Sequence, residues 1–228
     1  MNNLAIIPAR GGSKRIPRKN VKLFLGKPII AYSIEIALKS GLFTEVMVST
    51  DDQEIADIAI KYGASVPFLR SDKNSDDYAT TIDVLKEVII KYGDEDKIFD
   101  YACCIYPTAP LINIADLSRG YDYLRFDQPN SVFPIVAFNY PIWRGFEINE
   151  HNIPRLVWPE HLNTRSQDLK KVYHDAGQWY WFNPATLSTT LFTNNSKTIV
   201  LDETQVQDID NLTDWQIAEI KFQLLNGN

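Results

Sequence analysis

The chain has 228 residues, of which 45% are hydrophobic and 12% aromatic, and its net charge is −6. This composition excludes disordered and fibrous proteins and suits one α/β domain spanning residues 1–228. No stretch approaches the roughly 18 apolar residues of a membrane span, and the acidic charge disfavours a nucleic-acid partner. The N-terminus lacks the basic region of a secretory signal, so we expect a cytoplasmic protein.

The first predicted element is a strand at 4–7, which leads through a basic loop to a helix at 27–41. Five positive charges lie within ten residues of this loop, at Arg10, Lys14, Arg15, Arg18 and Lys19. Gly11 and Gly12 have no Cβ, so backbone N–H groups can approach an anion while the cations supply charge. The pattern predicts a polyphosphate site, and the alternative is an ordinary solvated basic loop. It matches neither the Walker A nor the GxGxxG spacing.

Apolar strands then alternate with amphipathic helices. Strands are predicted at 45–51, 64–68, 101–107 and 131–138, and helices at 51–63, 80–93 and 114–124. Such alternation predicts a Rossmann-like, mostly parallel sheet flanked by helices, with ligands at the carboxyl ends of the strands. Cys103 and Cys104 are adjacent within the strand at 101–107, where buried thiols are favoured over a redox or metal role.

The alternation stops at about 139–182, a segment with four of the five tryptophans. We expect an inserted segment that forms a subunit interface, because Trp and Tyr are enriched in interfaces. The alternative is that these aromatic residues pack back on their own sheet. The residues in question are Tyr140, Trp143, Trp158, Tyr173, Trp179, Tyr180 and Trp181.

Near the C-terminus, a strand leads to Asp208 and Asp210, and a helix begins near Thr213. The expected apolar stripe of that helix contains Trp215, Ile217 or Ala218, Ile220 and Leu224. Two carboxylates at i and i+2 in an extended loop point to the same side and suit Mg²⁺, which takes its other ligands from water and substrate phosphates. The alternative role of such an acid pair is capping the helix.

Five motifs in one order carry a family resemblance. IPARGGSKRIPRKN at 7–20 resembles the N-terminal motif of the cytidylyltransferases that activate sialic acids and related nonulosonic acids as CMP-sugars. The other motifs are FLRSDKNSDDYATT, YPTAPL, RSQDLKKVYHDAGQWYW and QDIDNLTDW. Tyr106, Arg15 and the segment HDAGQWYW depart from the broader pattern. The DAGQ hairpin, together with YPTAP and NYPIWR, is similar to the pseudaminic acid branch of the family.

The resemblance implies a reaction of CTP with an acidic nine-carbon sugar that gives a CMP-sugar and pyrophosphate, and pseudaminic acid is the expected sugar. It implies that Arg10, Lys14 and Lys19 are catalytic and, together with the rest of their loop, bind nucleotide. The full nucleotide set is Ala9, Arg10, Gly11, Gly12, Ser13, Lys14, Lys19, Asn20, Arg70, Thr80 and Thr81. The sugar set is Tyr106, Thr108, Arg165, Gln167, Asp175 and Gln178, and the metal set is Asp208 and Asp210.

Simpler roles stay open for several of these side chains. Arg70 could form an ordinary ion pair, and Thr80 and Thr81 could cap a helix. His174 could be a base or a hydrogen-bonded hairpin residue. Trp179 and Trp181, with Tyr106, are expected to offer aromatic surface to the deoxy end of the sugar. We also expect a homodimer in which the segment around Arg165 approaches the other subunit's site.

Other functions remain to be separated from this one. A related enzyme could activate neuraminic, legionaminic or ketodeoxyoctonic acid. A sugar-1-phosphate nucleotidyltransferase or a DxD glycosyltransferase would also use acids and Mg²⁺ on a nucleotide-binding sheet. A non-catalytic nucleotide-binding regulatory module is the alternative outside enzymes.

Overall fold

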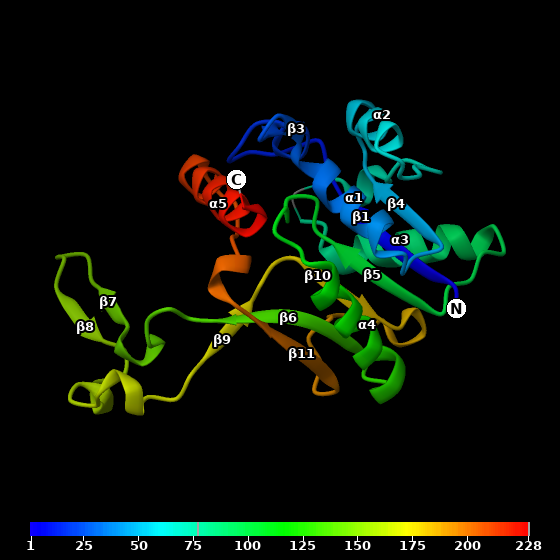
Figure 1. Cartoon of the computed structure of the whole chain (residues 1–228). Coiled ribbons are helices and arrows are strands. Elements are labelled where there is room, and N and C mark those ends of the chain that lie inside the picture. Colours follow the sequence, from blue (N-terminus) through cyan, green and yellow to red (C-terminus); the bar gives the residue numbers. More distant parts are fainter. Residues whose placement is uncertain (77, 228) are drawn as a thin grey trace.

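Strands and helices alternate from the N-terminus to residue 137 of the computed structural model, which describes residues 1–76 and 78–227 (Figure 1). Asp77, within the motif at 68–81, lies outside the described residues. The helices are α1 Ile29–Ser40, α2 Gln53–Lys61, α3 Thr81–Asp94, α4 Ile114–Asp127 and α5 Leu212–Asn226. The strands are β1 Asn3–Pro8, β2 Leu23–Phe24, β3 Lys27–Pro28, β4 Glu45–Ser49, β5 Tyr101–Ile105, β6 Ser131–Ala137, β7 Phe146–Ile148, β8 Pro154–Leu156, β9 Tyr173–Asp175, β10 Trp179–Phe182 and β11 Ser196–Leu201.

The central sheet has the order β11-β6-β10-β5-β1-β4 among the described strands, and β9 pairs along β6. Strand β1 runs parallel to β4 and β5, and β11 runs parallel to β6, whereas β9 and β10 are antiparallel to their neighbours. The prediction of a mostly parallel sheet flanked by helices is therefore confirmed. Because β1 and β5 are parallel neighbours, the loops that follow them meet at one edge of the sheet.

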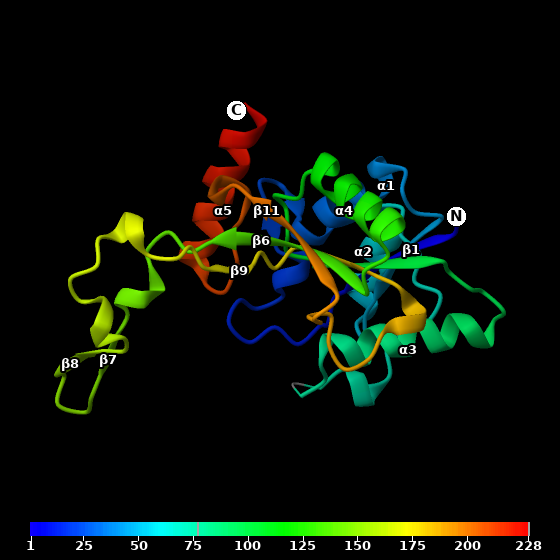
Figure 2. The ribbon, with the colours of Figure 1, turned by 90° about the horizontal axis from the view of Figure 1, so that it is seen from below.

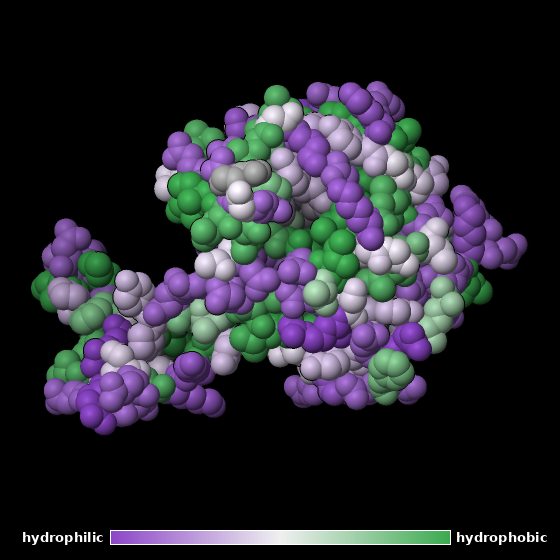
Figure 3. Space-filling model, in the orientation of Figure 1, coloured by the Kyte–Doolittle hydropathy of each residue, from purple (hydrophilic) through white to green (hydrophobic). Residues whose placement is uncertain are grey.

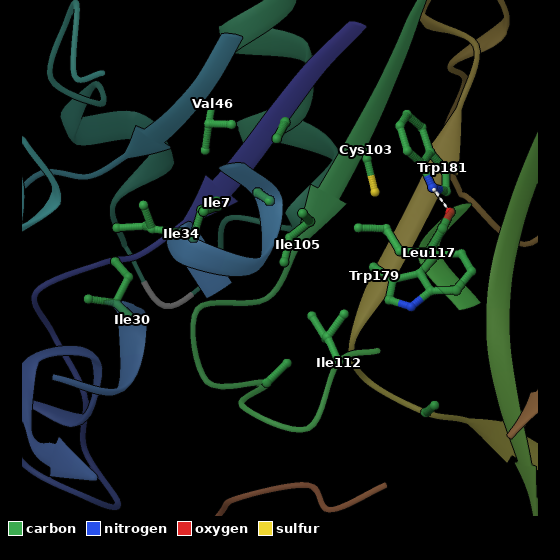
Figure 4. Close-up of a cluster of buried hydrophobic side chains, with 14 of the residues drawn as sticks. Ile7, Ile30, Ile34, Val46, Cys103, Ile105, Ile112, Leu117, Trp179 and Trp181 are labelled. Carbon is green, nitrogen blue, oxygen red and sulfur yellow. Dashed lines mark hydrogen bonds between the residues drawn. The ribbon is translucent and has the colours of Figure 1, made fainter. Parts of the chain in front are cut away.

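Alternate residues of β1 face two different layers of helices. Ala5 and Ile7 belong to a buried cluster with residues of α1, α2 and α4, whereas Leu4 and Ile6 lie in a cluster with α3 (Figure 4 shows part of the first). The adjacent cysteines of β5 divide in the same way, with Cys103 on the first face and Cys104 on the second. Both are buried, and burial raises the pKa of each thiol, as expected of core cysteines.

Strand β10 overturns the interface role expected for the aromatic residues near residue 180. Trp179 and Trp181 are completely buried, and the Trp181 indole donates a hydrogen bond to the Leu117 carbonyl of α4 at 3.0 Å (Figure 4). Gly120 provides the space, because a Cβ there would lie 2.5 Å from the Trp179 ring. These tryptophans pack on their own sheet, so the expectation that they face a second subunit or the sugar is wrong. Their position between β5 and β6 explains the burial.

The inserted segment is accordingly shorter than predicted. Residues 139–172, here called the arm, extend away from the sheet and include the hairpin β7–β8 (Figures 1 and 2). The chain then returns through β9 and β10, so the predicted end at 182 is wrong. Within the arm, the rings of Trp143 and Trp158 contact each other at a centroid distance of 5.4 Å.

The segment at 64–68 forms one β-bridge, between Ser65 and Met47, in place of the predicted strand. Pro67 has no N–H group to continue the ladder, which accounts for the early end of the pairing. The other predicted strands and helices are present with small shifts at their ends.

Helix α5 contacts the rest of the chain through a narrower strip than predicted. Trp215 and Ala218 are buried with Ile16 and Phe24, but Ile220 is 64% exposed and Leu224 is 68% exposed. The helix thereby packs the C-terminal end of the chain beside the basic loop that follows β1 (Figure 1). Within the described residues, the helices are too short or too polar to cross a membrane.

Candidate active site

The basic loop is fastened to the β4–α2 corner. Gly11 N donates to Asp51 Oδ1 at 2.9 Å, and the Arg18 guanidinium pairs with Asp52 at 2.5 Å and with Glu54. A Cβ on Gly11 would lie 2.7 Å from Asp52 Oδ2, whereas one on Gly12 would meet nothing within 4 Å. Close packing therefore requires glycine at position 11, and this requirement does not extend to Gly12.

Lys19 joins this loop to the other end of the chain. Its Nζ donates to the Ile209 carbonyl at 2.7 Å, between Asp208 and Asp210. Burial lowers the pKa of the Lys19 ammonium, and the two nearby aspartates oppose that change. Arg15 lies beside the same acids, with its guanidinium 2.6 Å from the Asp210 carboxylate. Residues about 190 positions apart thus share one electrostatic environment.

The donor set at Asp208 and Asp210 suits a divalent metal. Ile209 between them is only 1% exposed, and its burial turns both aspartates to the opposite, accessible side. Two carboxylates offer hard oxygen ligands and leave room for phosphate oxygens and water, as Mg²⁺ prefers. Helix capping is done by other residues, because Asn211 accepts from Asp214 N and Asp214 returns the bond. Asn211 and Asp214 therefore cap α5, which is the alternative role considered for Asp208 and Asp210.

A cleft of about 610 Å³ brings ten of the predicted residues together beyond the carboxyl ends of β1 and β5. They are Arg10, Ser13, Lys14, Lys19, Asn20, Arg70, Thr80, Thr81, Tyr106 and Thr108. Asn20 fixes the loop by donating to the Arg10 carbonyl at 2.9 Å, and Arg10 reaches the Asp76 carbonyl at 3.2 Å. The cations among its described lining residues, which include Arg15 and Arg70, suit an anion with several negative charges.

Arg70 and the threonines form the wall opposite the basic loop. Arg70 is only 7% exposed, and it is held by the side chain and carbonyl of Ser49. Thr80 caps α3 in a reciprocal pair with Asp83, so the predicted capping role is present. Thr81 Oγ1 lies 3.4 Å from the hydroxyl of Tyr106. Tyr106 therefore lines the cleft beside the start of α3.

A second pocket of about 460 Å³ adjoins the cleft at Tyr106 and contains both Asp175 and Asp208. The Asp175 carboxylate is fixed, because one oxygen accepts from Tyr180 OH at 2.5 Å and the other from Gly177 N at 3.1 Å. Tyr180 is buried beneath it, and burial raises the pKa of its phenol. The pocket thus offers one anchored carboxylate beside the proposed metal ligands.

Other residues predicted to contact sugar lie elsewhere. Gln178 is buried, and its side-chain amide donates to the Gln205 backbone carbonyl at 2.6 Å. The backbone carbonyl of Gln178 accepts from Tyr106 N. Thr108 lines the first cleft. Arg165 is on the arm, paired with Asp168 at 2.7 Å, and Gln167 lines a separate hollow beside the arm. Within this chain, neither of these arm residues belongs to the described lining of the two main pockets.

Sequence reasoning missed several residues that line the second pocket. Asn139, Glu203 and Lys221 line it and lie outside the five motifs. Gln207 also lines it, as the first residue of the motif QDIDNLTDW, in which only the two acids were assigned a role. His174 also lines it, with Nδ1 2.9 Å from the Asp175 carbonyl, so its ring takes part in a hairpin hydrogen bond. The sequence left a base and a hairpin residue as alternatives for His174, and this hydrogen bond is the one expected of a hairpin residue.

Comparisons with known proteins agree with this geometry. A model of the cytidylyltransferase family matches residues 4–189. Pseudaminic acid cytidylyltransferase of Campylobacter jejuni is 46% identical, with 98% of this chain and 97% of that protein covered. CMP-N,N'-diacetyllegionaminic acid synthase of Legionella pneumophila is 33% identical at 98% and 97% coverage. A solved structure of CMP:2-keto-3-deoxy-manno-octonic acid synthetase with CTP has a TM-score of 0.71 at 17% identity, over the whole of both chains, which shows a shared fold.

Proposed function

Because the chain belongs to the cytidylyltransferase family, we propose that it transfers CMP from CTP to the anomeric hydroxyl of pseudaminic acid and releases pyrophosphate. The observation that carries this proposal is the contact of Lys19 with the Ile209 carbonyl at 2.7 Å, which places the basic loop beside Asp208 and Asp210. The identity of 46% to a pseudaminic acid cytidylyltransferase supports the choice of sugar.

The reaction exchanges one phosphorus–oxygen bond for another. The anomeric oxygen forms a bond to the α-phosphorus while the bond from that phosphorus to the pyrophosphate oxygen breaks, and the hydroxyl proton is released. The protein's contribution to such a step is positioning and charge neutralisation. Arg10, Lys14 and Lys19 line the cleft and would neutralise the triphosphate and the departing pyrophosphate.

Asp208 and Asp210 would hold Mg²⁺, which when bound neutralises charge on the nucleotide phosphates. Arg15 shares Asp210 with that ion, and its side chain is 69% exposed, so opening the Arg15 pair costs little. Ser49 keeps the Arg70 guanidinium at the cleft wall, where it would contact the nucleotide together with Thr80 and Thr81.

The second pocket would receive the sugar. Tyr106 lines both cavities, so it would stand where the attacking sugar oxygen meets the α-phosphate. Compared with sialic acid, pseudaminic acid lacks the terminal hydroxyl and carries a second acylamino group. The anchored Asp175 is suited to accept a hydrogen bond from an N–H or O–H of that sugar.

The arm would complete the site in a homodimer. Several apolar side chains are exposed on it, including Phe146 at 61% and Ile148 at 67% (Figure 3 shows hydrophobic residues on this projection). Such surface on a projecting hairpin favours contact with a second copy. In that arrangement Arg165 would approach the partner's sugar pocket.

A pyrophosphate-release assay tests the function, with CTP, ATP, GTP and UTP each combined with pseudaminic, legionaminic, neuraminic and ketodeoxyoctonic acids. We expect release with CTP, and at least about a hundredfold higher efficiency with pseudaminic than with neuraminic acid, since mismatched polar groups would be left unpaired. A competition of the two sugars, read by mass spectrometry, gives the ratio directly. Preference for another acid would correct the sugar, and CTP binding without release for any acid would favour the regulatory module.

A further inference from the structure

The sugar pocket contains several acidic side chains but one Lys or Arg among its described lining residues. Asp175, Asp208 and Glu203 line it, and the lysine is Lys221 of α5. The sugar in the proposed reaction carries a carboxylate, which needs a cation or several donors when it leaves water. The following inference rests on that proposed function and concerns the residue that binds the carboxylate.

The Lys221 ammonium is held at a fixed place in the pocket wall. Its Nζ donates to the Glu203 carbonyl at 2.9 Å and to the Val206 carbonyl at 2.6 Å. A protonated lysine has three N–H donors. Two carbonyl partners orient the group and leave one donor for a ligand. Burial lowers the pKa of this ammonium, and the charges of Glu203 and Asp202 oppose that change.

Two of the three acidic groups in the pocket, Asp175 and Asp208, have other partners or another proposed role. Both Asp175 oxygens accept hydrogen bonds within the chain, from Tyr180 and Gly177. Asp208 is assigned to the metal. Arg165, the cation that sequence resemblance places near the sugar, is paired with Asp168 on the arm. A carboxylate that enters the pocket of a single chain therefore meets Lys221 as the one Lys or Arg among the described lining residues.

We propose that Lys221 Nζ binds the carboxylate of the acidic sugar and thereby selects an acid over a neutral analogue. The carboxylate adjoins the anomeric carbon in such sugars. Fixing it would also orient the anomeric hydroxyl toward the cleft that begins at Tyr106. Lys221 is in this sense a specificity-determining residue that contacts substrate and takes no part in bond breaking.

The test compares two ligands that differ only in that charge. Pseudaminic acid and its C1 primary amide are titrated by calorimetry into full-length protein saturated with Mg²⁺ and a CTP analogue whose α–β bridge is a methylene. The wild-type protein is expected to bind the acid about ten- to a hundredfold more tightly than the amide, as for hydrogen bonds between charged groups.

Lys221→Met should reduce this preference to less than about threefold while the affinity for the amide changes little. A merely structural role of Lys221 would weaken both ligands alike. Lys27→Met is the matched control, because Lys27 is also partly buried and its ammonium pairs with Glu35 at 2.9 Å, outside the described lining of both the cleft and the sugar pocket. It should retain the wild-type ratio. Lys221→Gln keeps a donor for the wall carbonyls and replaces the Met variant if that variant is unstable.

Two results would overturn the inference. An undiminished preference for the acid in the Lys221 variants would show that another group binds the carboxylate. Loss of the preference in Arg165→Met alone would assign it to the arm of a second copy. Wild-type protein that binds neither ligand would overturn the proposed function as well, so the two failures are distinguishable.

Discussion

Asp208 and Asp210 are the residues on which the metal assignment depends. We expect Asp208→Asn and Asp210→Asn each to lower kcat by about a hundredfold or more, since the phosphates would lose charge neutralisation. The fold should persist, because Asp208 is exposed and Asp210 is partly exposed. Pyrophosphate release measures the first effect and thermal unfolding the second. The control is Asp127→Asn, because Asp127 forms an exposed pair with Lys197. Unchanged turnover of Asp210→Asn at limiting Mg²⁺ would contradict the metal assignment.

Lys19 tests whether the basic loop acts on the transition state. If its charge stabilises the departing pyrophosphate, Lys19→Ala should reduce kcat by about a hundredfold, and Arg10→Ala should behave similarly. Lys61→Ala, at the end of α2, provides an exposed control. Normal kcat with a raised KM for CTP would show that these cations only hold the substrate.

Predicted residues lie together where a motif follows a strand of known neighbours. Arg10, Lys14 and Lys19 follow β1, Tyr106 follows β5, and all four line one cleft because these strands are parallel neighbours. Gln178 lies between β9 and β10, where only the tertiary packing decides that its side chain is buried and bonded to the Gln205 carbonyl. Lys221 could not be predicted, because its place depends on how α5 packs against the chain.

At the scale of the element, the loop after β1 depends on its packing against the N-terminus of α2. Gly11→Ala should lower the free energy of unfolding by about 1–3 kcal/mol, the usual cost of overpacking, because the added Cβ would lie 2.7 Å from Asp52 Oδ2. Gly12→Ala is the matched variant and should change it by less than about 0.5 kcal/mol. Denaturant titration of both proteins gives the comparison. Equal effects at the two positions would show that the loop can shift away from Asp52.

Helix α3 holds the segment that carries Arg70 through one carboxylate. Burial of Glu87 acts to raise its pKa, but hydrogen bonds from Lys91, Asn74 and Ser71 outweigh it and lower the pKa from 4.5 to about 2. A depressed carboxyl pKa means that this stabilisation is fully present above about pH 4.5 and is lost as the pH falls toward 2.

Glu87→Gln should therefore lower the free energy of unfolding by about 1–3 kcal/mol at pH 7, and the difference from wild type should shrink between pH 5 and pH 3. Unfolding by denaturant at several pH values measures this dependence. Glu95→Gln, which breaks an exposed pair with Lys97, should cost less than about 0.5 kcal/mol. A pH-independent difference would show that Glu87 acts through packing alone.

Element prediction failed where local pattern and tertiary position diverge. The run WYWF of β10 is continuously aromatic, and such a run fits an exposed interface and a strand buried on both faces equally well. Its place between β5 and β6 is a property of the sheet order. In α5, apolar residues occur around much of the helix, so the pattern alone could not tell that Trp215 faces inward and Leu224 outward.

At the scale of the whole molecule, the arm predicts a homodimer. Light scattering should give about twice the 26.1 kDa chain mass, and a specific interface of this kind buries on the order of 1,600 Å² or more. Phe146→Ser and Ile148→Ser together should weaken the dimer, because both side chains are exposed on the arm. The control is Ile98→Ser, because Ile98 is also exposed but lies outside the arm. A monomer with full activity at working concentration would contradict the dimer.

Arg165 decides whether the dimer shares its active sites. If Arg165 serves the partner's pocket, Arg165→Ala and Asp210→Asn chains are each inactive alone but complement one another, because the Arg165→Ala subunit keeps its acids and receives Arg165 from its partner. Random mixing makes half of the dimers mixed, each with one intact site, so about a quarter of wild-type activity should return. The two proteins are mixed after mild dissociation and assayed for pyrophosphate release, with unmixed samples as controls. If Arg165 acts within its own chain, no mixture regains activity, since every site then carries one of the two defects.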